Sequence, residues 1–286
     1  MKAQIYDETR CQLGEGPLWH PLRNELIWFD ILGQKLHRRG DNLLHTIALD
    51  EITTAAAWVD ETRLLLASET GLSLFDLNDQ SLRLLAPLEA GNPLTRSNDG
   101  RADRQGGFWI GTMGKRAETG AGAIYRFYRG EVRKLYSDIT ISNAICFAPD
   151  GQLAYWADTA KQQIMAQPLD AEGWPQGAPR VFVDLTAEKL SPDGAVVDAA
   201  GHLWNAQWGA GRVAEYDPSG KFLRALPLPA RQATCPAFGG PDLTSLICTS
   251  AAAGMADDGS EAAQAQGQTF IFKGVTKGQA EARVLL

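Results

Sequence analysis

Four oxygen-bearing side chains lie at matched distances ahead of aromatic residues. The offset is 11 to 13 residues in each case: Glu15 before Trp28, Asn98 before Trp109, Asn143 before Tyr155 and Asp193 before Trp204. A shared offset indicates one structural position in four copies of a repeat, and repeats arranged around an axis would bring these side chains together there. Carboxylate and amide oxygens are the ligands of hard divalent cations. The spacing therefore predicts a site for Ca²⁺, Mg²⁺ or Mn²⁺, with Zn²⁺ as an alternative because carboxylates also bind it.

The elements that must position these side chains recur through the whole chain. Six apolar, strand-like segments have marker residues 37 to 49 apart: residues 26–30, 63–68, 107–112, 153–158, 202–207 and 245–250. A period of this length with several strands in each copy is typical of β-propellers. Asp-Gly and Pro-Asp-Gly pairs before the strands indicate hairpins, and a further strand pair follows in most copies. We therefore predict an all-β fold, a six-bladed β-propeller with four strands per blade, whose strand edges are short and protected.

The 286 residues fit a single propeller domain, residues 1–286, because closed all-β folds reach this length as one domain. Residues 251–268, rich in Ala, Gly, Asp and Gln, are expected to form a surface loop of the last repeat. We expect residues 3–6 and 282–286 to complete one blade together and so close the ring.

Composition excludes several partner classes. The net charge is −7 without a basic cluster, so we expect no nucleic acid partner. No apolar run has the length of a signal peptide or a membrane span, so we expect no membrane partner either. The four cysteines are scattered without metal-type spacing, which favours a reduced, cytoplasmic protein. The sequence does not indicate an oligomeric state.

In a propeller the innermost strand of each blade lines the central channel, and the offsets place the polar residues on that strand. Counting back in the two remaining blades gives six channel positions: Glu15, Thr54, Asn98, Asn143, Asp193 and Cys235. A plainer interpretation exists, because Asn-Asp-Gly and Pro-Asp-Gly are common turns, and propeller repeats share turns at equal positions without binding anything. The tryptophans at 19, 28, 109 and 156 are expected to pack within blades rather than to contact a substrate.

The motifs in combination resemble the senescence-marker-protein/gluconolactonase/luciferin-regenerating family, over about residues 13 to 250. They are Gly-Glu-Gly-Pro-Leu-Trp at 14–19, Arg-Ser-Asn-Asp-Gly-Arg-Ala-Asp at 96–103, Gly-Thr-Met at 111–113, Ile-Ser-Asn at 141–143, Tyr-Trp-Ala-Asp-Thr at 155–159, Pro-Asp-Gly at 192–194 and Gly-Arg-Val at 211–213. The resemblance implies a six-bladed propeller with one divalent cation at its axis that hydrolyses sugar-acid lactones. It implies metal ligands at Glu15, Asn143 and Asp193, and substrate-binding residues at Arg96 and Asn98.

The expected activity is that of a gluconolactonase-like aldonolactonase acting on a small sugar lactone. A cation, with Ca²⁺ favoured, would polarise the ring carbonyl, and Asp193 would accept the proton of the attacking water. Where animal members carry paired acids, this chain has Lys115 and Arg116, so Arg116 is a candidate substrate-binding residue for an anionic sugar lactone. Two alternatives stay open: a calcium-binding regulatory protein and a non-catalytic propeller that serves as an interaction module.

Overall fold

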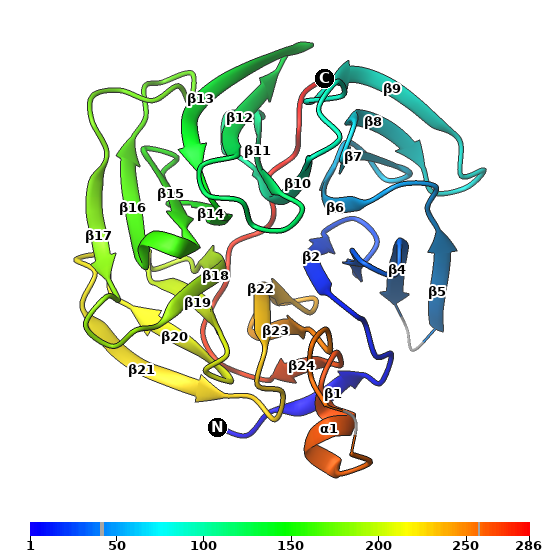
Figure 1. The fold of residues 1–286 in the computed structure, drawn as a ribbon, viewed down its shortest axis with the longest axis vertical. Coiled ribbons are helices and arrows are strands. Elements are labelled where there is room, and N and C mark those ends of the chain that lie inside the picture. The colour runs from blue at the N-terminus through cyan, green and yellow to red at the C-terminus, as the bar shows by residue number, and fades with distance from the viewer. Residues whose placement is uncertain (41–42, 257) are drawn as a thin grey trace.

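The computed structural model describes residues 1–40, 43–256 and 258–286, and over these residues the chain forms six four-stranded antiparallel sheets arranged in a ring (Figure 1). The predicted six-bladed β-propeller is confirmed. The first three blades are β2 (Gly14–His20), β3 (Glu25–Asp30), β4 (Lys35–Gly40) and β5 (Leu43–Ala48); β6 (Thr53–Trp58), β7 (Arg63–Ser68), β8 (Gly71–Asp76) and β9 (Leu82–Pro87); and β10 (Thr95–Ala102), β11 (Phe108–Gly114), β12 (Gly122–Tyr128) and β13 (Glu131–Ile139).

The other three blades follow the same order from the channel outwards. They are β14 (Ser142–Phe147), β15 (Leu153–Asp158), β16 (Gln163–Pro168) and β17 (Arg180–Asp184); β18 (Ser191–Val197), β19 (Leu203–Trp208), β20 (Arg212–Tyr216) and β21 (Phe222–Pro227); and β22 (Ala233–Gly239), β23 (Ser245–Ser250), β24 (Thr269–Phe272) and β1 (Gln4–Asp7). Within the described part of the chain, two short helices lie in connections, η1 (Thr159–Lys161) after β15 and α1 (Glu261–Ala265) between β23 and β24.

The ring closes through the N-terminal strand alone. β1 pairs with β24, with Gln4 opposite Ile271, so the expected role of the N-terminal segment is confirmed. The expectation that residues 282–286 share this blade is wrong. Because β1 already occupies the outer edge of the sixth blade, the C-terminal segment leaves that blade and crosses the middle of the ring, where it is drawn in red (Figure 1).

Residues 278–286, here called the C-terminal strap, close one end of the central channel. Gln279 donates from Nε2 to the carbonyl oxygens of Phe147 and Val197 at 3.1 and 2.9 Å. Trp58 Nε1 donates to the carbonyl oxygen of Glu281 at 2.9 Å. These acceptors and donors lie at the C-terminal ends of the inner strands β14, β18 and β6, so the strap covers that end of the channel.

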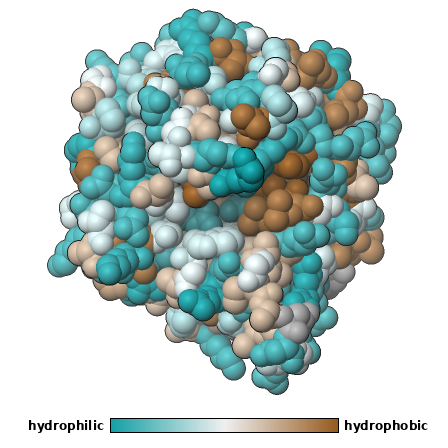
Figure 2. All heavy atoms as spheres, viewed as in Figure 1, coloured by the Kyte–Doolittle hydropathy of each residue, from teal (hydrophilic) through white to brown (hydrophobic). Residues whose placement is uncertain are grey.

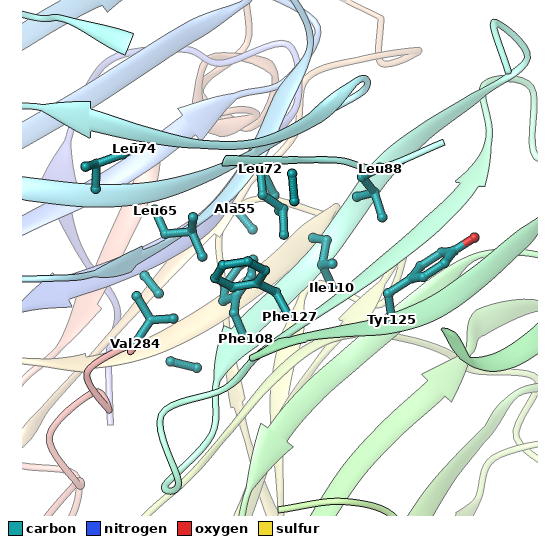
Figure 3. Packing of buried hydrophobic residues seen from close by; sticks show 14 of the residues in the cluster. Ala55, Leu65, Leu72, Leu74, Leu88, Phe108, Ile110, Tyr125, Phe127 and Val284 are labelled. Atoms are coloured by element: carbon teal, nitrogen blue, oxygen red, sulfur yellow. The ribbon is translucent and has the colours of Figure 1, made fainter. Parts of the chain in front are cut away.

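The apolar core lies mainly between neighbouring blades. Figure 3 shows one such cluster, in which Leu65 and Leu72 of the second blade meet Phe108 and Phe127 of the third. Val284 of the strap is fully buried in the same cluster, which anchors the C-terminus against the ring. The residues Trp19, Trp28, Trp109 and Trp156, expected to pack within the blades, all lie in buried clusters.

The outer surface mixes polar and apolar side chains. On the face seen in Figure 2, apolar side chains gather beside the centre of the ring among polar neighbours. Over the described residues, no helix has the length and apolar character needed to cross a bilayer.

Each inner strand carries a register irregularity near its N-terminal end. The shifts fall between Glu15 and Leu18, Thr53 and Ala55, Ser97 and Gly100, Asn143 and Cys146, Pro192 and Ala195, and Ala233 and Pro236. A bulge bends the strand and redirects a side chain out of the regular alternation. The repeated polar position is therefore a repeated bulge, which turns one side chain per blade towards the axis.

Candidate metal centre and substrate pocket

A pocket of about 300 Å³ opens at the N-terminal ends of the inner strands, opposite the C-terminal strap. It contains five of the residues expected at the site: Glu15, Arg96, Asn98, Asn143 and Asp193. The remaining lining residues are Leu13, Met113, Ile141, Thr159, Ser191 and Trp208. Thr54 and Cys235, which we also expected on the inner strands, are buried beside the channel and do not line the pocket.

Two carboxylates form the acidic centre of the pocket. Glu15 and Asp193 are 8 % and 6 % exposed, and their side chains are hydrogen-bonded to each other. Burial, and then the negative charge of Asp99, raise the pKa of Glu15 to about 8. Burial and the charge of Glu15 likewise raise the pKa of Asp193 well above its ordinary value. Two buried acids that repel each other in this way are stabilised by a shared divalent cation, so the donor set fits such an ion.

The backbone around Glu15 requires glycine. Its Oε2 accepts a hydrogen bond from the amide of Gly16 at 2.9 Å, which holds the carboxylate close to its own strand. Gly16 has a φ of +55°, and a β-carbon there would collide with the carbonyl oxygen of Thr54 in the next blade. Glycine is the residue that tolerates both conditions.

Asn143 is oriented by Thr159, a residue that sequence reasoning did not identify. Asn143 Nδ2 donates to Thr159 Oγ1 at 2.8 Å, and that hydroxyl donates in turn to the carbonyl oxygen of Pro192 at 2.7 Å. Because the threonine hydroxyl has given its hydrogen away, it must accept from the amide, which leaves Oδ1 of Asn143 on the side of the pocket. Ala144, the next residue, has a φ of +56°, a left-handed conformation that only glycine adopts without strain.

Arg96 and Asn98 form the polar wall beside the acids. Arg96 Nη1 donates to Asn98 Oδ1 and to the carbonyl oxygen of Ser97, both at 2.8 Å. Asn98 Nδ2 donates to the carbonyl oxygen of Ser142 at 2.8 Å and to Asn143 Oδ1 at 3.2 Å. Over the described residues both hydrogen bonds of Arg96 come from Nη1, so Nη2 and Nε are available to a ligand. Burial lowers the pKa of Arg96 to about 10, an effect opposed by the charges of Glu15 and Asp193.

A third acid, Asp99, lies beneath the pocket and was not among the expected site residues. It is 5 % exposed, and its Oδ2 accepts a hydrogen bond from the amide of Ile145 at 2.7 Å. Burial raises its pKa to about 6, while the guanidinium of Arg101 below it acts in the opposite direction. Arg101 is itself paired with Glu281 of the C-terminal strap. The strap thus reaches the acidic centre through the buried ion pair of Glu281 with Arg101 and the attraction between Arg101 and Asp99.

Arg116 is not brought to the pocket. Its side chain is 86 % exposed and its Nε lies 3.1 Å from Oε1 of Glu118, two residues away. Lys115 pairs with Glu69 and also does not line the pocket. Glu118 is close to Arg116 in the sequence, whereas the partner of Lys115 could not be inferred from the sequence, because Glu69 belongs to the preceding blade.

A second group of potential metal ligands, Asp198, His202 and Glu215, lies in the fifth blade, with ligand atoms within 4.8 Å of one another. Its oxygens already have partners. Asp198 Oδ1 accepts the amides of Ala200 and His202 at 2.9 Å, and Oδ2 accepts from Trp204 Nε1 at 3.1 Å. Glu215 contacts His202 Nδ1 at 2.7 Å and Arg224 Nε at 2.5 Å. These hydrogen bonds hold the three side chains within the blade. The pocket is therefore the better candidate for a cation site.

The chain is similar throughout most of its length to known proteins. Residues 13–252 match the model of the SMP-30/gluconolactonase/LRE-like family. A relative from Rhizobium meliloti (strain 1021), named as a sugar lactone lactonase, is 42 % identical over 98 % of this chain and 96 % of its own. The 6-deoxy-6-sulfogluconolactonase of Pseudomonas putida is 35 % identical over 83 % of each chain. A crystal structure of a calcium-binding protein, regucalcin, from Agrobacterium tumefaciens strain C58 is 44 % identical, with a TM-score of 0.96 over 99 % of this chain and 97 % of that one.

Proposed function

This chain belongs to the SMP-30/gluconolactonase/LRE-like family, and we propose that it is a sugar lactonase, a hydrolase that opens the lactone ring of a sugar acid with the aid of one divalent cation. The observation that carries the proposal is the meeting of Glu15, Asn143 and Asp193 with Arg96 and Asn98 in one pocket. These residues come from four blades, so their proximity is a property of the ring and not of one local turn.

Glu15, Asn143 and Asp193 would hold the cation. Their donors are all oxygens, which favours Ca²⁺, and the calcium-binding neighbour supports that choice; Mg²⁺, Mn²⁺ and Zn²⁺ are the alternatives. When bound, the ion supplies Lewis acidity, which polarises the lactone carbonyl and stabilises negative charge on its oxygen.

The side chains of the pocket supply orientation and proton transfer. A lactone is an activated ester, so no covalent nucleophile is required. Arg96 donates from Nη2 and Nε to substrate oxygens, while its hydrogen bond to Asn98 fixes the guanidinium plane. Asp193 accepts the proton of the attacking water. Burial raises the pKa of this carboxyl, which makes it a stronger base than an exposed aspartate, and a neighbouring cation would favour its ionised form.

An anionic sugar lactone is a second candidate substrate. The name of the Pseudomonas putida relative supports it. The ion pairs of Lys115 with Glu69 and of Arg116 with Glu118 do not, because they hold both cations outside the pocket lining. For the location in the cell, the four buried and unpaired cysteines support the cytoplasm, where thiols stay reduced.

The test is a calorimetric titration with Ca²⁺, Mn²⁺ and Zn²⁺, followed by measurement of acid release on a panel of aldonolactones. We expect one bound ion and hydrolysis that a chelator abolishes. Asp193→Ala should lose ion binding and hydrolysis together, whereas Asp217→Ala, which changes a half-buried acid outside the pocket, should lose neither. Ion binding without acid release would favour the calcium-binding regulator, and the absence of both would favour the interaction module.

A further inference from the structure

Trp208 is the one aromatic side chain among the described residues that line the pocket. Seven other tryptophans have structural roles. Five lie in buried clusters, namely Trp19, Trp28, Trp109, Trp156 and Trp204. Trp58 packs against the core and donates to the strap, and Trp174 contacts the ring of Tyr128 and the guanidinium group of Arg126. Within the described chain Trp208 has no such hydrogen bond, ring contact or cluster, so packing does not account for it.

The strand pairing places Trp208 beside the acidic centre. It is the last residue of β19 and lies opposite Ser191 of β18, two residues before Asp193. The chain then turns through Gly209, which has a φ of +78° and open space where a β-carbon would be. The backbone of Trp208 is therefore fixed by strand pairing, while the space beside the following residue, Gly209, is open.

We infer that Trp208 is the platform on which the ring of a neutral sugar lactone lies; this inference rests on the proposed function. An indole face carries negative quadrupole charge and attracts the weakly positive C–H groups of a sugar ring, whose hydroxyls project towards the sides. Hydroxyls of a stacked ring can then reach Arg96 and the oxygen donors, while Met113 and Ile141 cover its apolar edges. A pocket of mixed aromatic, apolar and convergent polar groups is the usual form of a small-molecule site.

The charges in and below the pocket indicate that the ligand is neutral. With a divalent cation bound, the carboxylates of Glu15, Asp193, Asp99 and Glu281 are balanced by that cation together with the guanidinium groups of Arg96 and Arg101. Among the described residues that line the pocket, Arg96 is the one cation, and Lys115 and Arg116 are paired with acids elsewhere. An added phosphate or sulfonate would meet an Arg96 whose charge is already balanced, and its other neighbours would be apolar side chains such as Met113 and Ile141.

The test compares Trp208→Ala and Trp208→Phe with Trp174→Phe, a partly buried tryptophan outside the pocket. Steady-state hydrolysis is measured with D-glucono-1,5-lactone, L-arabinono-1,4-lactone and 6-phospho-D-glucono-1,5-lactone, and binding of the lactones by calorimetry. We expect Trp208→Ala to raise KM for the neutral lactones about tenfold, as the loss of one stacking contact does, with kcat changed less. Trp208→Phe should stay within about threefold of the parent, since phenylalanine keeps a ring face. Trp174→Phe should leave KM unchanged, and calcium affinity should be the same in all variants.

The outcomes separate this inference from the proposed function. If the parent hydrolyses neutral lactones and Trp208→Ala has the same KM, the inference about Trp208 is wrong while the proposed lactonase function stands. Preference for the phosphorylated lactone overturns the neutral substrate. If the parent binds neutral lactones without hydrolysing them, and Trp208→Ala weakens that binding, the platform stands and the lactonase falls. If it neither binds nor hydrolyses them, both fall.

Discussion

Glu281→Gln tests whether the C-terminal strap holds the channel closed through electrostatics. In the native protein the Glu281 carboxylate pairs with Arg101, and both side chains are about nine-tenths buried. Arg101 also donates to the carbonyl oxygens of Ala195 and Pro236 at 3.3 and 3.4 Å, so it is fixed in the channel and cannot turn to solvent. The substitution keeps the shape of the side chain and removes its charge.

The expected loss of stability is about 3 kcal/mol. Removing one partner of a buried ion pair costs roughly 3–5 kcal/mol, because the remaining charge is left without compensation. Asp99 also faces Arg101 and retains part of that compensation, which places the loss at the lower end of the range. The strap itself should stay in place, because Val284 and Leu285 donate backbone hydrogen bonds to Trp58 and Gly106. Domains have total stabilities of about 5–15 kcal/mol, so the effect is large.

Urea unfolding followed by tryptophan fluorescence measures the change. The comparison requires that the free energy of unfolding falls with urea concentration at the same slope in both proteins. Glu118→Gln is the control: it removes the same charge from an exposed pair with Arg116 and should leave the midpoint where it is. A loss below about 1 kcal/mol in Glu281→Gln would refute the reasoning, since it would mean that Arg101 is solvated or compensated elsewhere. A second variant, Arg101→Met, should be at least as harmful as Glu281→Gln, because it leaves the buried carboxylates of Glu281 and Asp99 without their shared cation.

Three further predictions concern the pocket. Without a divalent cation, the free energy of unfolding should fall by up to roughly 5 kcal/mol as the pH rises from about 4.5 to about 8, because Glu15 stays protonated in the folded chain and ionises in the unfolded one. Thermal unfolding in the presence of a chelator measures this change. An increase in the free energy of unfolding over that pH interval would contradict the burial of the acid pair. Asp193→Asn should bind the cation better than Asp193→Ala, since an amide oxygen also ligates, yet lose at least about 100-fold in kcat because the proton acceptor is gone; equal cation affinity in the two variants would remove Asp193 from the ligand set. Thr159→Val should weaken cation binding about tenfold, because it removes the hydrogen bond that orients the side-chain amide of Asn143. Calorimetry measures the affinity, with Thr186→Val as an exposed control. An unchanged affinity would show that Asn143 does not need the hydrogen bond to Thr159.

The number of blades and the order of their strands could be predicted because the sequence repeats the same pattern in each blade. Strand-like segments at regular spacing, each preceded by turn residues, do not depend on distant parts of the chain. Glu15, Asn98, Asn143 and Asp193 could be selected for the same reason, since equal offsets in equivalent blades must lead to equivalent positions. The inner-strand bulges explain why those positions face the axis.

The misjudged segments and residues depend on contacts between blades. Residues 282–286 have strand-like composition, but β1 occupies the edge they would need, and Val284 is buried between two other blades instead. Arg116 looked like a pocket residue because it follows the family motif at 111–113, whereas Glu118 holds it in solvent. Trp208 lies outside the family motifs, and Thr159 ends the motif at 155–159 without a role that the motif reveals. Both are identified as site residues only by their place beside the pocket.

The sequence by itself determined a six-bladed ring, the four polar positions at its axis and the family, because each is encoded in local spacing that every copy repeats. Only the tertiary structure decided which cations reach the pocket, which aromatic ring faces it and how the C-terminal strap seals the opposite end of the channel. Those features arise where side chains from different blades meet, and the energy of such contacts depends on distances across the ring that spacing along the chain does not specify.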